Sequence, residues 1–279
     1  GIDTGLMEEP PVKLEIRTGG STERYPFRSE NEWPLARTQW TKYYLQIERE
    51  PSSDAHASEG TFATTPPAKA AKLSYSASGV TKAGVASGSS LSTTHGNVGR
   101  SGVSFETPAM KEDTELTGPL AMKLWVSSTS EDMDIFATLR NIDPAGKDVW
   151  EIGQQQQPVP VAKGWLRVSH RKQDPKKSLP YRPWHAHDER LPLQKGEIVR
   201  VEVEIWPTCM VFGKGHRLRL DIQPRDGAGW DNRTAWMGHA ALSSAKDHVF
   251  AQSMARGGVG QAGVDNAPFH AFIDDWFFD

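Results

Sequence analysis

Cysteine is almost absent from this chain, since Cys209 is the only one among 279 residues. A single thiol forms no internal disulfide and supplies no multi-cysteine zinc site. No apolar run approaches the ~18 residues of a membrane-spanning helix. Neither charge dominates, because 32 Lys and Arg residues face 35 Asp and Glu residues, a net charge of −3. These absences exclude a disulfide scaffold and a membrane span, and they argue against a nucleic-acid partner, which would require a basic patch.

The chain also lacks the nucleophile motif of the α/β hydrolases, Gly-x-Ser-x-Gly, which exposes a serine on a strained turn. No glycine is followed by serine two positions on and glycine four positions on, and the nearest sequence, Gly99-Arg100-Ser101-Gly102, fails this spacing. We therefore predict no catalytic residue and no cofactor, and we expect the chain to be inactive as an enzyme by itself.

The first residues, Gly1 to Gly5, contain neither an initiator Met nor a basic and apolar leader segment. We expect either a processed start or a piece of a longer polypeptide. One cysteine suits both the cytoplasm and a secreted protein, so the compartment stays open.

Apolar and polar residues alternate in several short segments, which is the period of a half-buried strand. The clearest segments are 199–206 and 217–222, and the others are 12–16, 120–126, 134–139 and 165–171. Glycine and proline turns separate them, and no alternation of strands with helices is visible. This pattern predicts an all-β fold, an antiparallel β-sandwich with long irregular loops.

Two regions depart from the strand pattern. Residues 51–112 are rich in Ser, Gly, Ala and Pro and predict loops with two weak strands, near 72–76 and 103–105. Residues 233–256 fit one short helix as well as a strand, whereas the aromatic tail 269–278 predicts a segment that docks on the body. We predict one domain over 1–279, divided into 1–50 (linker and first strands), 51–112 (loops), 113–225 (sandwich core) and 226–279 (an atypical C-terminal segment).

Histidine and carboxylate residues cluster in one loop, where His185, His187 and Asp188 are candidate metal ligands. A strand would place the two histidines on one face, which suits chelation. The preceding residues read as a loop, however, and no histidine-rich partner motif follows. We therefore favour ordinary loop histidines and predict no metal.

Acidic and arginine residues recur at alternate strand positions. The favoured interpretation is a structural network in which arginines pair with Asp132, Asp134 or Asp221 inside the sheet system, and the alternative is an arginine clamp for an anion. The predicted network comprises Trp125, Asp132, Asp134, Trp165, Arg167, Arg171, His216, Arg217 and Arg219.

Ten tryptophans are a high count for this length. Exposed tryptophans on a sandwich can stack on sugars, so a carbohydrate-binding module is the alternative function. Its candidate residues are Trp33, Trp40, Trp184 and Trp206. Packing in the core or at an interface is the favoured interpretation of these side chains.

Several segments together resemble a known family. They are 116–147, 164–171 and 191–222, the last containing Gly215-His216-Arg217-Leu218-Arg219-Leu220, and 11–45 with Glu32-Trp33-Pro34. These blocks are similar to the C-terminal β-sandwich domain of the X-prolyl dipeptidyl peptidase and cocaine esterase family, which are serine hydrolases that cleave acyl esters or X-Pro peptides. Residues 228–279 do not follow the family pattern.

The resemblance implies a jelly-roll sandwich of the galactose-binding-like type. It also implies a partner, the α/β-hydrolase catalytic core, on which this domain packs and whose active-site cleft it helps to wall. The family's catalytic Ser, Asp and His belong to that core, which is absent from this sequence. An interface left uncovered would expose apolar surface, so a homodimer is a further expectation.

Overall fold

The computed structural model describes residues 4–20, 25–50, 57–68, 70–76, 102–152, 158–223 and 268–278, the last strand by its backbone alone. Within these ranges the chain is all-β, with two short 3-10 helices, η1 (Leu6–Glu8) and η2 (Val168–His170). The strands are β1 (Val12–Glu15), β2 (Phe27–Glu30), β3 (Thr41–Ile47), β4 (Gly60–Ala63), β5 (Leu73–Ser76), β6 (Val103–Glu106), β7 (Thr114–Ser127), β8 (Asp134–Ile142), β9 (Asp148–Val149), β10 (Glu151–Ile152), β11 (Pro158–Val159), β12 (Ala162–Arg167), β13 (Val199–Phe212), β14 (Arg217–Gln223) and β15 (Pro268–Phe278).

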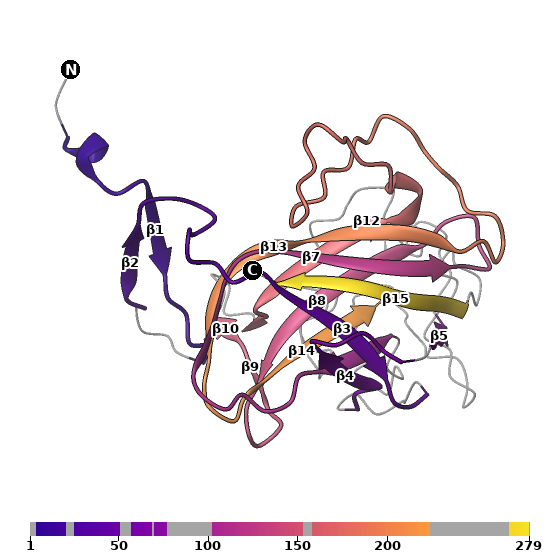
Figure 1. Ribbon diagram of the computed structural model, residues 1–279, viewed down its shortest axis with the longest axis horizontal. Coiled ribbons are helices and arrows are strands. Elements are labelled where there is room, and N and C mark those ends of the chain that lie inside the picture. Colours follow the sequence, from indigo (N-terminus) through magenta and orange to yellow (C-terminus); the bar gives the residue numbers. More distant parts are fainter. Residues whose placement is uncertain are drawn as a thin grey trace, which may run out of the picture.

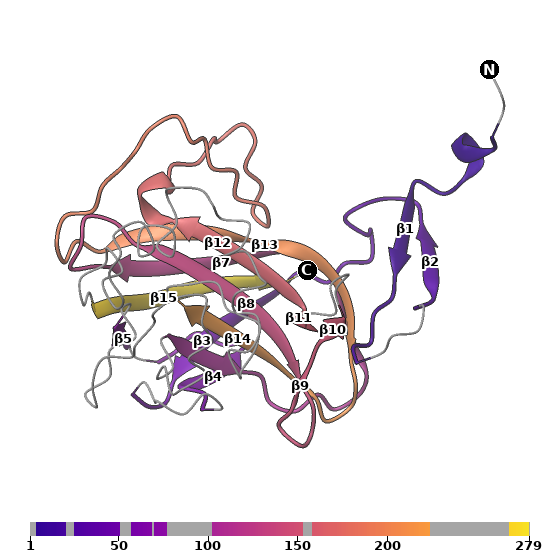
Figure 2. The ribbon, with the colours of Figure 1, turned by 180° about the vertical axis from the view of Figure 1, so that it is seen from behind.

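One large sheet builds the body of the molecule. Its 11 strands include the path β12-β13-β7-β15-β3-β4-β6-β14-β8-β9, and β5 pairs with β15 off this path. Strand β12 also pairs with β8, so the sheet curls back on itself. In Figures 1 and 2 the long strands β7 and β13 cross β8 and β14, which lie in the facing layer. This arrangement confirms the predicted all-β sandwich.

The core lies between the two layers and follows from strand alternation. Apolar side chains of β7 and β13 pair across the ladder, with Leu124 opposite Val201 and Met122 opposite Val203. All four are buried, while Glu202 between the two valines is partly exposed. In the facing layer Leu220 of β14 pairs with Leu139 of β8, and both are completely buried. The alternation that predicts these strands therefore also selects the core residues.

Three local expectations can be compared with the structure. The weak strands predicted near 72–76 and 103–105 are β5 and β6. The strand predicted over 165–171 is too long, because β12 ends at Arg167 and the chain turns into η2, where the Arg171 amide donates to the Val168 carbonyl. The predicted helix or strand at 233–256 lies outside the described residues.

The C-terminal strand β15 is inserted between β7 and β3, and its backbone pairs with both. The tail thus becomes a strand of the sheet rather than a separate segment on its surface. Within the ranges described, no helix is long and apolar enough to cross a membrane.

Candidate interaction surface

The N-terminal arm, described over residues 4–20 and 25–34, projects from the sandwich. It contains η1 and the two-stranded ribbon of β1 and β2, in which Val12 pairs with Glu30 and Glu15 with Phe27. Figures 1 and 2 both show this ribbon beside the body, with the N-terminus at its far end. It belongs to a sheet of its own, so its position depends on contacts at its root.

Arg17 fixes the root of the arm on strand β13. Its Nε donates to the carbonyl of Cys209 at 3.1 Å, and its Nη2 donates to the carbonyl of Val161 at 3.3 Å and to the Thr208 hydroxyl. The Arg17 carbonyl also accepts the Val211 amide at 2.8 Å. Such backbone and side-chain bonds hold the arm in one direction.

No residue of the N-terminal arm is buried. Its large apolar side chains are instead open to solvent, as Met7 is 95% exposed, Leu6 66%, Phe27 54% and Trp33 39%. Apolar side chains gathered on one projecting element are typical of a surface that another protein part covers.

Two charged side chains of the arm, Arg28 and Glu30, are paired within the chain. Arg28 makes two hydrogen bonds to the Glu115 carboxylate, at 2.6 and 2.8 Å, and a third to Glu30 at 2.6 Å. Arg37 donates to Glu30 at 2.8 Å. The hydrogen bond from Arg37, reinforced by Arg28, lowers the pKa of Glu30 to about 2. Arg28 and Glu30 are therefore engaged within the chain, whereas the Lys13 ammonium lies 4.9 Å over the Phe27 ring.

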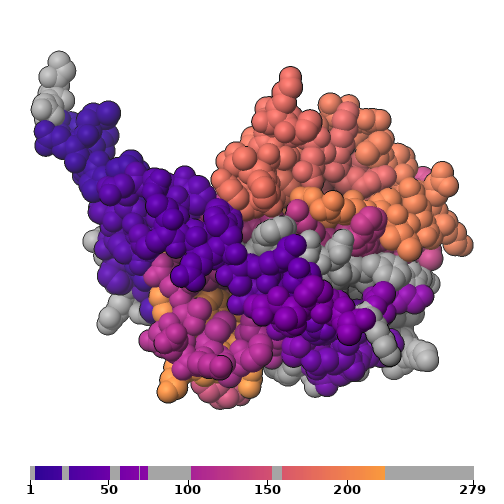
Figure 3. Space-filling view, viewed as in Figure 1, coloured from indigo at the N-terminus to yellow at the C-terminus, as the bar shows by residue number. Residues whose placement is uncertain are grey.

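A second projection, which we call the finger, consists of residues 171–188. Backbone bonds tie its two sides together, from the Ala186 amide to the Lys172 carbonyl at 3.0 Å and from the Asp174 amide to the Trp184 carbonyl at 2.8 Å. Near its tip the Tyr181 ring stacks on Trp40 with 4.4 Å between centroids. Figure 3 shows a hollow between the N-terminal part of the chain and the salmon-coloured region that contains the finger.

The loop histidines lie at the base of the finger. His170 and His187 face each other with 3.0 Å between their Nδ1 atoms, and the ring centroids of His185 and His187 are 6.1 Å apart. Burial, reinforced by the neighbouring His187, lowers the pKa of His185. Asp188 lies instead against Lys172, at 3.2 Å. Among the described residues no three histidine, cysteine or carboxylate side chains are arranged to hold a metal ion.

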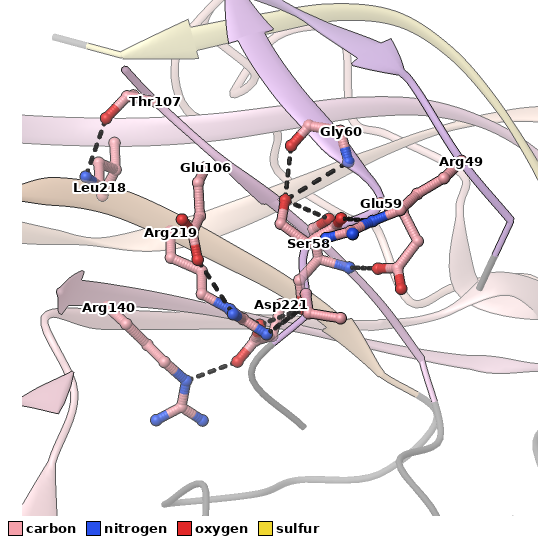
Figure 4. A network of polar contacts seen from close by, with 12 residues as sticks. Arg49, Ser58, Glu59, Gly60, Glu106, Thr107, Arg140, Leu218, Arg219 and Asp221 are labelled. Atoms are coloured by element: carbon pink, nitrogen blue, oxygen red, sulfur yellow. Dashed lines mark hydrogen bonds and ion pairs between the residues drawn. The ribbon is translucent and has the colours of Figure 1, made fainter. Parts of the chain in front are cut away.

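A buried ion network occupies the β6, β14 and β8 strands (Figure 4). Arg219 Nε donates to Asp221 at 2.7 Å, and its Nη atoms donate to Glu106 at 3.1 Å and to the Ser104 hydroxyl at 2.8 Å. Arg140 reaches the other oxygen of Asp221, at 2.5 Å. Both arginine side chains are almost completely buried.

Asp221 and Asp148 respond differently to this environment. Burial opposes ionisation of Asp221, but the charges of Arg219 and Arg140 outweigh it and hold the pKa of Asp221 below its usual range. Burial raises the pKa of Asp148 despite its 2.8 Å contact with Arg140. A carboxylate held ionised between two guanidinium groups is a structural arrangement. The Ser104 hydroxyl in this network donates to Asp221 and accepts from Arg219, so it bridges the two charged groups.

The other residues of the predicted network lie in separate places. Arg167 binds Asp134 through two bonds of 2.9 and 3.1 Å. Arg171, which has left the strand, donates to the carbonyls of Val168 and Leu191 rather than to a carboxylate.

Four more members of the predicted network lie elsewhere in the sandwich. Asp132 accepts the Ser169 amide at 2.9 Å, and His216 lies 2.8 Å from the side-chain oxygen of Asn141. Trp125 stands opposite Arg200 in the β7–β13 ladder, and Arg217 begins β14. The nine residues therefore do not form one network but lie in several separate groups. Among them, only Arg219 belongs to the buried ion network of Figure 4.

Sequence reasoning did not find Arg140, Asp148, Ser104 or Glu106. Arg140 lies directly across from Arg219 in the β8–β14 pair, and Ser104 lies across from Asp221 in the β6–β14 pair. The signal was Arg140 itself, the one basic residue in the segment 134–142, whose other polar members are Asp134, Thr138 and Asn141. Its partner could not be chosen without the strand register.

The candidate sugar-stacking tryptophans are partly exposed, from 39% at Trp33 to 58% at Trp206. Three of the four, however, contact another side chain. Trp40 stacks on Tyr181, Trp206 lies 5.3 Å from Trp165 between ring centroids, and the Lys177 ammonium sits 5.3 Å over the Trp184 ring. These contacts favour the packing interpretation over an open sugar platform.

Comparison with known proteins adds a family and a fold. Residues 4–235 match the family described as the X-Pro dipeptidyl-peptidase C-terminal non-catalytic domain. A protein of Mycobacterium bovis named as a serine esterase is 26% identical over 236 residues, which are 81% of this chain and 34% of that protein. The cocaine esterase of a Rhodococcus species is 23% identical over 254 residues, 84% of this chain and 37% of the esterase.

Solved structures agree on the fold. A CocE/NonD family hydrolase from Staphylococcus aureus is similar with a TM-score of 0.69 at 23% identity, over 99% of this chain and 42% of that chain. An aminopeptidase from a Thaumarchaeota archaeon is similar with a TM-score of 0.54 at 13% identity, over 99% of this chain and 42% of that chain. The chain thus spans about a third of the length of the curated relatives it matches.

Proposed function

This chain belongs to the family of X-Pro dipeptidyl-peptidase C-terminal non-catalytic domains, and from that premise we propose that it is the accessory domain of a serine hydrolase. In this role the domain packs on an α/β-hydrolase catalytic core and helps to wall the cleft that admits the substrate. The substrate class is an acyl ester or an X-Pro peptide, after the names of the family and of the esterases it resembles.

The observation that carries this proposal is the pairing of a complete sandwich with an uncovered arm. Residues of the sandwich bury a continuous apolar core, whereas none of the N-terminal arm is buried. A domain that folds around its own core and still presents apolar side chains on a fixed projection is suited to dock on a second protein part. Relatives supply such a part, because about two-thirds of their length lies outside the matched region.

The proposal also places the catalytic residues in the partner, the α/β-hydrolase core. The sequence has no Gly-x-Ser-x-Gly motif, and the charged side chains of the ion network hold one another in place. The accessory domain therefore contributes surface and rigidity, while the nucleophile, its base and the oxyanion donors belong to the catalytic core.

An active-site probe tests this division directly. The 279-residue chain, and the same chain preceded by the native region that the proposal places before residue 1, are each incubated with p-nitrophenyl acetate and with a fluorophosphonate probe. We expect hydrolysis and labelling from the longer protein alone. Labelling of a serine within the 279 residues would overturn the assignment of a non-catalytic domain.

A further inference from the structure

The histidines at the base of the finger arrive from two separate parts of the chain. His170 is the last residue of η2, which follows β12, whereas His185 and His187 lie on the returning side of the finger. The sequence favours ordinary loop histidines here, because no histidine-rich partner motif accompanies residues 185–188. The fold supplies a partner from η2, since His170 meets His187 with 3.0 Å between their Nδ1 atoms.

His185 is already oriented as a metal ligand would be. Its Nε2 is buried and has no hydrogen-bond partner, so the ring nitrogen that bonds to the Glu202 backbone in β13 is Nδ1. Metal-binding histidines commonly donate their second ring nitrogen to a backbone carbonyl, because this bond fixes the tautomer and leaves the other lone pair free. A buried lone pair without a partner costs free energy, and an ion that uses it removes that cost.

His187 reaches His170 through an uncommon backbone conformation. Its φ of 54° lies in the left-handed region, and no other non-glycine residue in the described part of the chain has a positive φ. Residues held in this way cluster at functional sites, where the surrounding contacts maintain the strain. The ring centroids of His170 and His187 are 5.2 Å apart. Two imidazoles that share one tetrahedral ion, at metal–nitrogen distances of about 2.0–2.1 Å, have ring centres about 5 Å apart.

We propose that His170, His185 and His187 bind one divalent transition-metal ion of the zinc class. The ligand atoms are Nδ1 of His170, Nδ1 of His187 and Nε2 of His185, and water completes the tetrahedron. The proton that one Nδ1 donates to the other passes through solvent to the Nε2 atom of its own ring, which frees both Nδ1 lone pairs. Imidazole nitrogen suits Zn²⁺, Ni²⁺ and Cu²⁺, whereas Mg²⁺ and Ca²⁺ prefer oxygen ligands.

The site needs one small movement to close. As the described side chains stand, no three of them meet the geometry of a metal site, and the wide spacing is the 6.1 Å between the ring centroids of His185 and His187. A shift of about 1 Å in the exposed His187 ring brings this spacing to that of ligands on one ion. The bound ion would then join η2, the finger and strand β13.

Neighbouring charges leave room for a cation at this position. The Lys172 ammonium lies 3.2 Å from Asp188 and 3.0 Å from Glu189, so two carboxylates balance its charge. The Arg171 guanidinium donates to the Leu191 carbonyl. Asp188 is a candidate ligand by sequence, but in this proposal it neutralises Lys172 and does not touch the ion.

Calorimetric titration of the 279-residue chain with Zn²⁺, free of any purification tag, tests the proposal. We expect a site that Mg²⁺ does not fill and that weakens at least tenfold in His170→Gln and in His187→Asn. Asparagine suits residue 187 because it tolerates the left-handed region. His216→Gln is the matched control and should keep the affinity within twofold, since His216 also hydrogen-bonds through Nδ1, to Asn141 at 2.8 Å, but lies outside the finger.

Electron paramagnetic resonance with one equivalent of Cu²⁺ counts the bound nitrogens. The wild type should show coupling to three imidazoles and His185→Gln coupling to two, while circular dichroism of each metal-free variant verifies its fold. Hydrogen exchange adds a structural readout. The Ala186 amide, which donates to the Lys172 carbonyl, should exchange at least tenfold more slowly with saturating Zn²⁺, because the ion ties the base of the finger to η2.

The outcomes decide the proposal independently of the proposed function. Zn²⁺ affinity that is equal in the wild type, His170→Gln and His187→Asn overturns the site and identifies an adventitious ion only, bound by other histidines. A spectrum that His185→Gln leaves unchanged refutes the role of His185 as a ligand. Exchange of the Ala186 amide that saturating Zn²⁺ does not slow refutes the link between η2 and the finger.

Discussion

Replacement of Arg219 by alanine is the sharpest perturbation of the ion network, because this side chain touches most of its members. Its guanidinium donates to Asp221, Glu106 and Ser104 at 2.7 to 3.1 Å and is 1% exposed. Alanine removes these three bonds and a fourth, from Nη2 to the Ala57 carbonyl at 3.1 Å, and leaves a cavity between β6 and β14. It also leaves the Asp221 carboxylate with one guanidinium in place of two.

The expected loss of stability depends on the partner that Asp221 keeps in the variant. Removal of one partner from a buried ion pair costs about 3–5 kcal/mol, because the other charge stays buried. Arg140 still holds Asp221 at 2.5 Å, so we expect the lower end, about 3 kcal/mol. At about 2–4 °C per kcal/mol for a domain of this size, the melting temperature should fall by about 6–12 °C.

Thermal unfolding followed by circular dichroism measures this shift, with three variants for comparison. Arg37→Ala removes an ion pair whose arginine is 59% exposed and should change the melting temperature by about 1 °C or less. Arg171→Ala removes bonds to two carbonyls and should be intermediate. Arg219→Met retains the side-chain volume without the charge. If Arg219→Ala melts within 2 °C of the wild type, the reasoning from buried charge is refuted.

Three further predictions concern other regions. Because burial lowers the pKa of His185, the unfolded chain binds this proton more readily than the folded one. The free energy of unfolding should therefore decline as pH falls below about 6.5, and urea titrations should show a weaker decline for His185→Gln. A Cβ on Gly60 would lie 1.8 Å from the Gln46 carbonyl oxygen, so Gly60→Ala should destabilise the domain by about 1–3 kcal/mol or more in the same titration. Arg17→Ala should accelerate limited proteolysis within residues 4–20 while the melting temperature of the sandwich changes little, and unchanged cleavage would contradict the anchoring role of Arg17.

Strand positions could be predicted wherever one face of the strand is buried, since burial imposes the period of two. Residues 199–205 alternate perfectly and form part of β13, and their apolar members are all in the core. The 3-10 turn at 168–170 could not be predicted in the same way. Its residues continue the polar and apolar pattern of β12, and the turn depends on tertiary bonds such as that from the Val168 amide to the Met133 carbonyl.

Only part of the ion network could be predicted from the sequence, for a related reason. Arg219 and Asp221 are neighbours on one face of a strand, so alternation alone puts them together. Arg140 joins them only because the register sets it opposite Arg219, and Asp148 follows through the β8–β9 turn. Register is a property of two segments far apart in sequence, and many registers satisfy the same hydrophobic pattern.

The arm shows how a mismatch between pattern and structure can itself be informative. Val12, Leu14 and Ile16 alternate with Lys13 and Glu15, which is the pattern of a strand with one face in a core. In the folded chain these three apolar residues are only half-buried. A buried-face pattern is selected by the environment in which the protein works. The apolar face that this chain leaves incomplete is therefore the face that we expect the catalytic core to cover.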